Sequence, residues 1–167
     1  MNSLKAIALL AMTLFVVGAG AHAEPLRAAI FPFELDDTSL QGAMQGPVSA
    51  DQARIAHLTT QLSDLLARSG QYQPVAAAAP TEATLRSCGG CDIDLASKLG
   101  AQVSVVGWVQ KVSSLILNIN VVIRDVATGT MIHAGSVDIR GDTDESWSRG
   151  LAYLVRNRIL LPAEPAK

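Results

Sequence analysis

Two cysteines give the chain its sharpest chemical pattern. Cys88 and Cys91 are separated by two glycines and stand just before a predicted helix. A CxxC pair in this place can serve thiol–disulfide exchange, because the positive end of a helix favours the thiolate form of cysteine. The acidic residues that follow, Asp92 and Asp94, oppose this effect because negative charge disfavours the thiolate. Two neighbouring cysteines in an exported chain usually form a structural disulfide. We therefore predict a structural disulfide and keep a redox-active pair as the alternative.

The same pair lacks the partners that a metal or haem site requires. Haem attachment needs CxxCH, but the residue after the second cysteine is Asp92. A zinc site needs two further ligands, and His57 and His133 stand on separate predicted elements. The sequence also contains no GxSxG turn and no P-loop, and no GxGxxG follows its first strand. We expect no metal, no cofactor and a protein that is not an enzyme.

Two further groups of residues could bind a small ligand. Asp36 and Asp37 stand in a predicted loop over residues 34–49. Such acids can bind a cation, although acids clustered in a loop are more often simply solvated. Trp108 follows Gly107 at the end of a predicted strand, where α/β sheets often place ligand sites. A packing role for this ring is the competing interpretation.

A polar strand face is the best candidate for contact with a partner. Residues 114–124 alternate, so that aliphatic side chains point one way while Asn118, Asn120 and Arg124 point the other. His133 on the next strand extends this face. A helix over the face would require hydrogen bonds to both amides, because buried unpaired amides are costly. An open face would instead serve as a docking surface for another protein.

The first 23 residues have the pattern of a secretory signal peptide. Lys5 precedes the uncharged apolar run 6–17, and an Ala-His-Ala sequence matches the small-x-small cleavage pattern. We expect cleavage before Glu24 and export to the periplasm, with an uncleaved N-terminal anchor as the alternative. The run is shorter than the roughly 20 residues that a membrane-spanning helix needs, so we expect no membrane span after cleavage. The 13 basic and 15 acidic residues form no basic cluster, which argues against a nucleic-acid partner.

The rest of the chain predicts one α/β domain over residues 24–161 and a flexible tail at 162–167. Strands are predicted at residues 27–33, 71–76, 103–109, 114–124 and 130–139. Helices are predicted at residues 50–68, with Ser49 as the N-cap, and at residues 93–99, with Asp92 as the N-cap. A last helix is predicted after an Asp142-x-x-Glu145 capping box, and a helical turn is predicted at 81–86. The order β-α-β-α-β-β-β-α predicts a three-layer α/β/α fold, in which helices cover both faces of a mixed five-stranded sheet.

The chain resembles the N-terminal domain of the TolB type in three segments, IFPFELDDTS, LASKLGAQVSVVGWV and IRDVATG. It resembles more narrowly a family of secreted bacterial proteins catalogued as a domain of unknown function, through CGGCDIDLA, VGWVQKVSSLILNINVVIRD and SVDIRGDTDESWSRGL. The resemblance implies a small α/β/α domain and assigns no activity. It also suggests a periplasmic quinoprotein dehydrogenase system as a partner.

The sequence therefore predicts a periplasmic accessory or binding protein that acts through contacts with other proteins. A thiol–disulfide protein that uses Cys88 and Cys91 is the first alternative. A small-ligand binder is the second.

Overall fold

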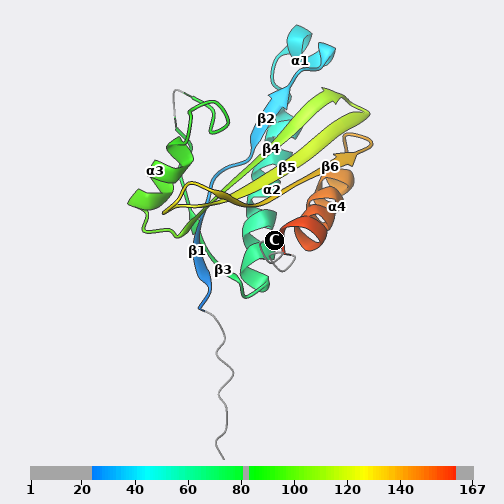
Figure 1. Cartoon of the computed structure of the whole chain (residues 1–167). Helices are drawn as coiled ribbons and strands as arrows, with labels where there is room; N and C mark the ends of the chain where they lie inside the picture. Colours follow the sequence, from blue (N-terminus) through cyan, green and yellow to red (C-terminus); the bar gives the residue numbers. More distant parts are fainter. Residues whose placement is uncertain (1–23, 81–82, 161–167) are drawn as a thin grey trace, which may run out of the picture.

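The computed structural model describes residues 24–80 and 83–160, and the fold that they form is a mixed β-sheet with helices packed against it (Figure 1). The expected signal peptide, the expected tail at 162–167 and the start of the expected helical turn at 81–86 lie outside the described residues. The α/β class, the mixed sheet and the helices on both of its faces are confirmed. The sheet has six strands rather than five.

The strands are β1 (Leu26–Ile30), β2 (Glu34–Asp37), β3 (Tyr72–Ala76), β4 (Val103–Ser113), β5 (Ile116–Asp125) and β6 (Met131–Ile139). The helices are α1 (Leu40–Gln45), α2 (Ser49–Arg68), α3 (Cys91–Lys98) and α4 (Asp144–Leu154), which continues into a π-helical turn, η1 (Val155–Ile159). The strand order is β3-β1-β4-β5-β6, and β2 adds to β4 beyond the end of β1. β1, β2 and β3 run parallel to their neighbours, whereas β4, β5 and β6 form an antiparallel meander.

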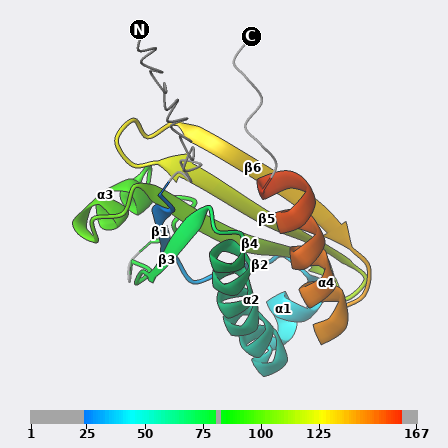
Figure 2. The same ribbon diagram turned by 90° about the horizontal axis from the view of Figure 1, so that it is seen from below.

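The main core lies between one face of the sheet and the helices α2, α4 and η1, which lie side by side (Figure 2). The predicted alternation of β5 supplies the sheet side of this core. The fully buried residues of this core include Leu117, Ile119, Val121 and Ile123 on β5, Leu58, Leu62 and Leu66 on α2, and Leu151 and Leu154 on α4. Burial of each such side chain contributes about 1.5–3 kcal/mol, so this layer is the main source of stability.

A smaller core lies on the opposite face, where α3 packs over β1 and the start of β4. Its central residues are Ala29 and Phe31 near β1, Ala96 on α3 and Val106 on β4. No helix among the described residues covers the rest of this face, which belongs to β4, β5 and β6 (Figures 1 and 2). Half of one sheet face is therefore open.

The prediction of a loop over residues 34–49 is wrong, because β2 and α1 lie in this segment. β2 pairs in parallel with β4, which places Glu34 opposite Trp108 and Asp37 opposite Lys111. The Ser39 side chain then caps α1 by accepting a hydrogen bond from the Gly42 N–H. β4 also runs on to Ser113, past the predicted end at residue 109.

Three predicted helix caps are displaced by one or two residues. α2 has Val48 rather than Ser49 at its N-cap. α3 has Gly90 there, with a left-handed backbone, instead of Asp92. The capping box of α4 is made by Thr143 and Ser146, one residue later than predicted.

Candidate functional site

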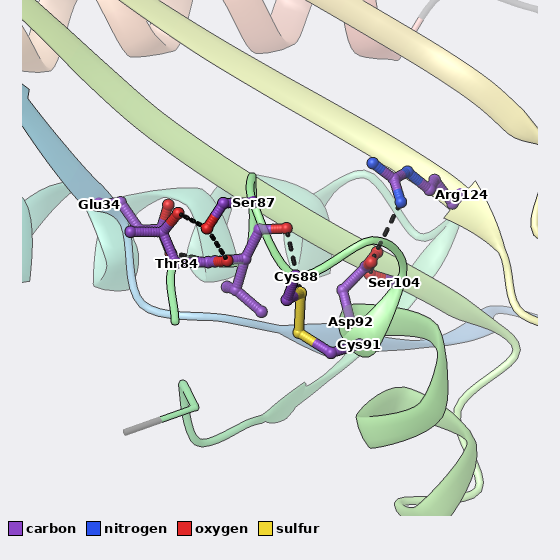
Figure 3. The surroundings of a disulfide bond; sticks show 9 residues. Glu34, Thr84, Ser87, Cys88, Cys91, Asp92, Ser104 and Arg124 are labelled. Carbon is purple, nitrogen blue, oxygen red and sulfur yellow. Dashed lines mark hydrogen bonds and ion pairs between the residues drawn. A yellow bond between two sulfur atoms is a disulfide. The ribbon is translucent and has the colours of Figure 1, made fainter. Parts of the chain in front are cut away.

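Cys88 and Cys91 form a disulfide, with 5.6 Å between their Cα atoms (Figure 3). Cys91 is the first residue of α3, and Cys88 ends a turn in which its N–H and the Ser87 N–H both donate to the Thr84 carbonyl. The bridge therefore ties this turn to the start of α3. It also lines a surface hollow of about 500 Å³, which contains Arg124 as well.

The turn before the disulfide is fixed to β2 by hydrogen bonds and ion pairs. The Leu85 N–H donates to Glu34 Oε1 at 2.6 Å, and the Arg86 guanidinium pairs with Glu34 at 3.3 Å and with Asp36 at 3.0 Å. The same guanidinium lies 5.8 Å from the ring centroid of Trp108, within cation–π range. Asp36, expected in a solvated loop, thus holds the arginine that covers this tryptophan.

A second anchor joins α3 to the sheet through Asp92, which is completely buried (Figure 3). The Ser104 hydroxyl donates to Asp92 Oδ2 at 2.7 Å, and Arg124 Nη1 donates to Oδ1 at 3.1 Å. Hydrogen bonds and an ion pair are what a buried carboxylate requires. Arg124 therefore lies on the predicted polar face but is engaged with α3.

Polar side chains line the uncovered half of the sheet. We call this surface the open face and define it by Trp108, Asn118, Asn120, Ser136 and Asp138. Asn120 lies opposite Trp108 on one side and Ser136 on the other, and Asn118 lies opposite Asp138. The Asn118 amide donates to Ser136 at 2.8 Å and to Asp138 at 2.7 Å, and the Asn120 amide donates to Asn118 Oδ1 at 2.6 Å. The two amides are thus satisfied within the protein while they remain accessible.

His133 does not extend this face, contrary to the prediction. The β5–β6 ladder shifts by one residue between Ile123 and Arg124, so that His133 pairs with Ile123. An unshifted hairpin would place it opposite Val122, on the open face. A shift by one residue moves every later side chain to the other side of the sheet. His133 therefore lies on the α4 side.

The structure links Asp36 to Trp108 through Arg86, but it places Asp37 elsewhere. Asp36 and Asp37 are successive strand residues, so their side chains point to opposite faces. Asp37 accepts a hydrogen bond from the Ser39 N–H at 2.9 Å, just before α1. Trp108 lies within β4 rather than at its end. Among the described residues, no three His, Cys, Asp or Glu side chains gather where they could hold a metal ion.

A buried cluster of charges, which the sequence did not predict, surrounds Lys111, and this residue is 1% exposed. Its ammonium group lies 2.5 Å from Asp51 and 2.6 Å from Asp142. Arg54 pairs with the same two carboxylates and, at 2.7 Å, with Asp144. Burial lowers the pKa of Lys111, but the hydrogen bonds and charges of the two aspartates outweigh it and raise the pKa above its ordinary value. The cluster joins α2, β4 and the segment before α4. Alternation along β4, which points Lys111 inward with Val109, is the signal that could have found it.

A hollow of about 200 Å³, smaller than the one beside the disulfide, lies between α2 and α4 next to this cluster. Arg54, His57 and Trp147 line it, and the Arg54 guanidinium lies 5.9 Å from the Trp147 ring centroid. The Trp147 N–H donates to Asp142 at 3.0 Å. The arginine and tryptophan are thus both engaged in holding the two helices together. In the described part of the chain, no helix combines the length and apolar character that crossing a membrane requires.

The chain is similar to known proteins both in sequence and in fold. Residues 26–159 match the family model DUF3280, described as "Protein of unknown function (DUF2380)". The predicted resemblance to a family of unknown function is thereby confirmed. No protein with a curated description matches the sequence.

Several solved structures are similar to the chain at low sequence identity. The dodecamer of a single-residue variant of PelC from Paraburkholderia phytofirmans matches with a TM-score of 0.51 and 12% identity, over 80% of this chain and 87% of that one. The LpoB C-terminal domain from Salmonella enterica matches with a TM-score of 0.48 and 16% identity, over 73% and 87%. TolB from Acinetobacter baumannii, the type named from the sequence, matches with a TM-score of 0.47 and 15% identity, over 74% of this chain and 25% of that one.

Proposed function

The chain belongs to the DUF3280 family of proteins of unknown function, and we propose that it is an exported, non-enzymatic protein whose open face binds another protein. The observation that carries this proposal is the uncovered half of the sheet, where Trp108, Asn118 and Asn120 are accessible on adjacent strands. α3 covers only the other half of the same face.

The chemistry of the open face suits a protein contact. An interface gains little when polar groups lose water without finding a partner, because each such group costs about 1–3 kcal/mol. Asn118 and Asn120 already have hydrogen-bond partners within the sheet, so covering them costs less. Arg86 lies over the Trp108 ring, so a tryptophan and an arginine stand next to each other on this surface. These two residue types are enriched among the residues that contribute most to protein binding.

The proposed compartment is the periplasm. The amino-terminal signal pattern supports export, and the Cys88–Cys91 disulfide is typical of an oxidising compartment. A periplasmic protein is therefore the partner to seek. A quinoprotein dehydrogenase system, suggested by the family resemblance, is the first to test.

Affinity capture with matched variants tests the proposal. Tagged protein over residues 24–167 is incubated with periplasmic extract of the source bacterium, as wild type, as Asn120→Arg and as Thr60→Arg. Thr60 is exposed on α2, so this control adds the same charge to the opposite side of the molecule. The proposal predicts a partner that wild type and Thr60→Arg retain and Asn120→Arg loses. Equal capture by all three proteins would contradict it.

Thiol–disulfide exchange is the second candidate, favoured by the hollow beside the disulfide. Equilibration with glutathione and alkylation of free thiols measures the reduction potential of the pair. A potential below about −300 mV indicates a structural bridge, whereas one between about −230 and −120 mV indicates an oxidoreductase.

A further inference from the structure

Large apolar side chains are exposed at the end of the molecule where β4 turns into β5. We call this group the apolar tip and define it by Leu40 and Met44 on α1 and by Val112, Leu115 and Ile116 at the β4–β5 turn. Met44 is 76% exposed and Leu115 is 68% exposed. Single exposed apolar residues are common on protein surfaces, whereas a group of them marks contact with another protein or with a membrane.

Backbone hydrogen bonds bring the two parts of the tip together. The Thr38 N–H and the Thr38 hydroxyl both donate to the Lys111 carbonyl, at 2.9 and 3.3 Å. Leu40 follows this contact by two residues on one segment, and Val112 follows it by one residue on the other. Figure 1 shows α1 and the β4–β5 turn at the same end of the molecule, away from the start of β1.

Helix α1 is held by its ends, and its apolar residues point away from the rest of the chain. None of its six residues is buried. Ser39 caps its start, and at its end the Gly46 N–H donates to the Gly42 carbonyl. A hollow of about 250 Å³ separates the helix from β2 and the start of α2. Leu40 and Met44 are four residues apart and therefore share one face of the helix. The chain itself offers nothing that covers this face.

The composition of the tip favours lipid over protein as its partner. Residues 38–50 and 112–123 contain no charged residue, so no charge has to enter an apolar phase, where it would be costly. Protein binding usually relies on tryptophan, tyrosine and arginine, and leucine and valine are under-represented among its strongest contacts. Neither segment contains any of those three residue types. A bilayer accepts any apolar side chain, and the binding strength follows the apolar area that becomes buried.

We propose that the apolar tip inserts into the surface of a phospholipid bilayer, at the boundary between the headgroups and the acyl chains. The protein then lies on the membrane and does not span it. Because the tip contains no lysine or arginine, the attraction is apolar and does not require anionic lipid. This role is separate from that of the open face.

Flotation with neutral phosphatidylcholine vesicles tests the insertion. The bound fraction of protein over residues 24–167 gives a partition coefficient for wild type, Met44→Asp, Leu115→Asp and Thr60→Asp. Each aspartate in the tip should lower the partition coefficient on the order of tenfold, because a carboxylate would enter the apolar boundary. Thr60→Asp adds the same charge on the exposed side of α2 and should leave the coefficient nearly unchanged. Anionic phosphatidylglycerol in the vesicles should not raise binding.

A gain of binding gives a second readout. Leu115→Trp should raise the partition coefficient, because tryptophan favours the membrane–water interface. The fluorescence of this variant should also shift to shorter wavelength when vesicles are added, and that of the wild type should shift less. Circular dichroism first establishes that every variant is folded.

Four results would contradict the insertion. They are a wild type that does not bind neutral vesicles, tip variants that bind as well as wild type, equal loss in Thr60→Asp, and binding that requires anionic lipid. A captured protein that Met44→Asp loses, without vesicle binding by the wild type, would show that the tip contacts a protein instead. Asn120→Arg should bind vesicles like wild type, so failure at the tip and failure at the open face are distinguishable.

Discussion

Gly107 lies directly against the ring of Phe33, and a Cβ atom added at this glycine would be 2.5 Å from the ring. The glycine on β4 is therefore needed for packing in the main core, where Phe33 is 3% exposed. This contact explains the Gly-Trp pair that suggested a ligand site in the sequence.

Substitution Gly107→Ala should destabilise the protein by about 1–3 kcal/mol, because the added methyl group overpacks a filled core. Urea denaturation measures the change. The double variant Gly107→Ala/Phe33→Leu should lose less stability than the two single changes added together, since the smaller side chain makes room for the methyl group. Additive losses would mean that Phe33 is not the group that the alanine meets.

The buried charges around Lys111 should make that residue more sensitive than any exposed lysine. Lys111→Met leaves Asp51, which is 0% exposed, without its ammonium partner. Removal of one member of a buried pair costs about 3–5 kcal/mol. Lys98→Met, on the exposed side of α3, is the matched control and should change stability by less than about 0.5 kcal/mol. Thermal and urea unfolding compare the two, and equal effects would show that the cluster does not contribute to stability.

Asp125 should stabilise the turn between β5 and β6 at neutral pH but not in acid, where its carboxylate becomes protonated. Its carboxylate accepts hydrogen bonds from the Thr128 hydroxyl and the Thr128 N–H, both at 2.8 Å, and these lower its pKa below the ordinary 3.8. A lowered pKa in the folded state means that the stabilisation is present above pH 3.8 and is lost as the pH falls through the lowered value. Asp125→Ala should therefore lower the melting temperature at neutral pH and lose this effect in strong acid. A difference that stays constant with pH would contradict the assignment.

Removal of the disulfide should lower the stability of the fold. It should also make the Trp108 ring more accessible, because Arg86 would be held less firmly over it. The double variant Cys88→Ser/Cys91→Ser should lose about 2 kcal/mol, at the low end for disulfides because the bridge spans only three residues. In a Trp147→Phe background, Trp108 is the remaining tryptophan, and its fluorescence should be quenched more readily by acrylamide when the bridge is absent. Unchanged quenching would show that Arg86 holds its place without the disulfide.

The meander and its two faces could be predicted because β5 carries a clear local pattern. Residues Leu117 and Ile119 are buried and Asn118 is accessible, as the alternation predicts. β2 could not be predicted in this way, since its sequence ELDD is typical of a loop and becomes a strand only through pairing with β4. Local pattern alone does not specify such long-range pairing.

Lys111 and His133 show the same limit for individual side chains. Lys111 lies past the predicted end of its strand at residue 109, and its partners lie 60 residues before it and 31 residues after it. The side of the sheet to which His133 belongs depends on a register shift that no local pattern marks. Prediction from sequence therefore fails at residues whose environment comes from distant segments.

Site-specific photo-cross-linking in the intact bacterium tests the central claim most directly. A photoreactive amino acid replaces Asn120 on the open face or Thr60 on α2, and adducts are identified after irradiation. The account predicts a defined adduct with a periplasmic protein from position 120 and none from position 60. Absence of adducts at position 120, or the same adducts at both positions, would contradict the assignment of the open face as a binding surface.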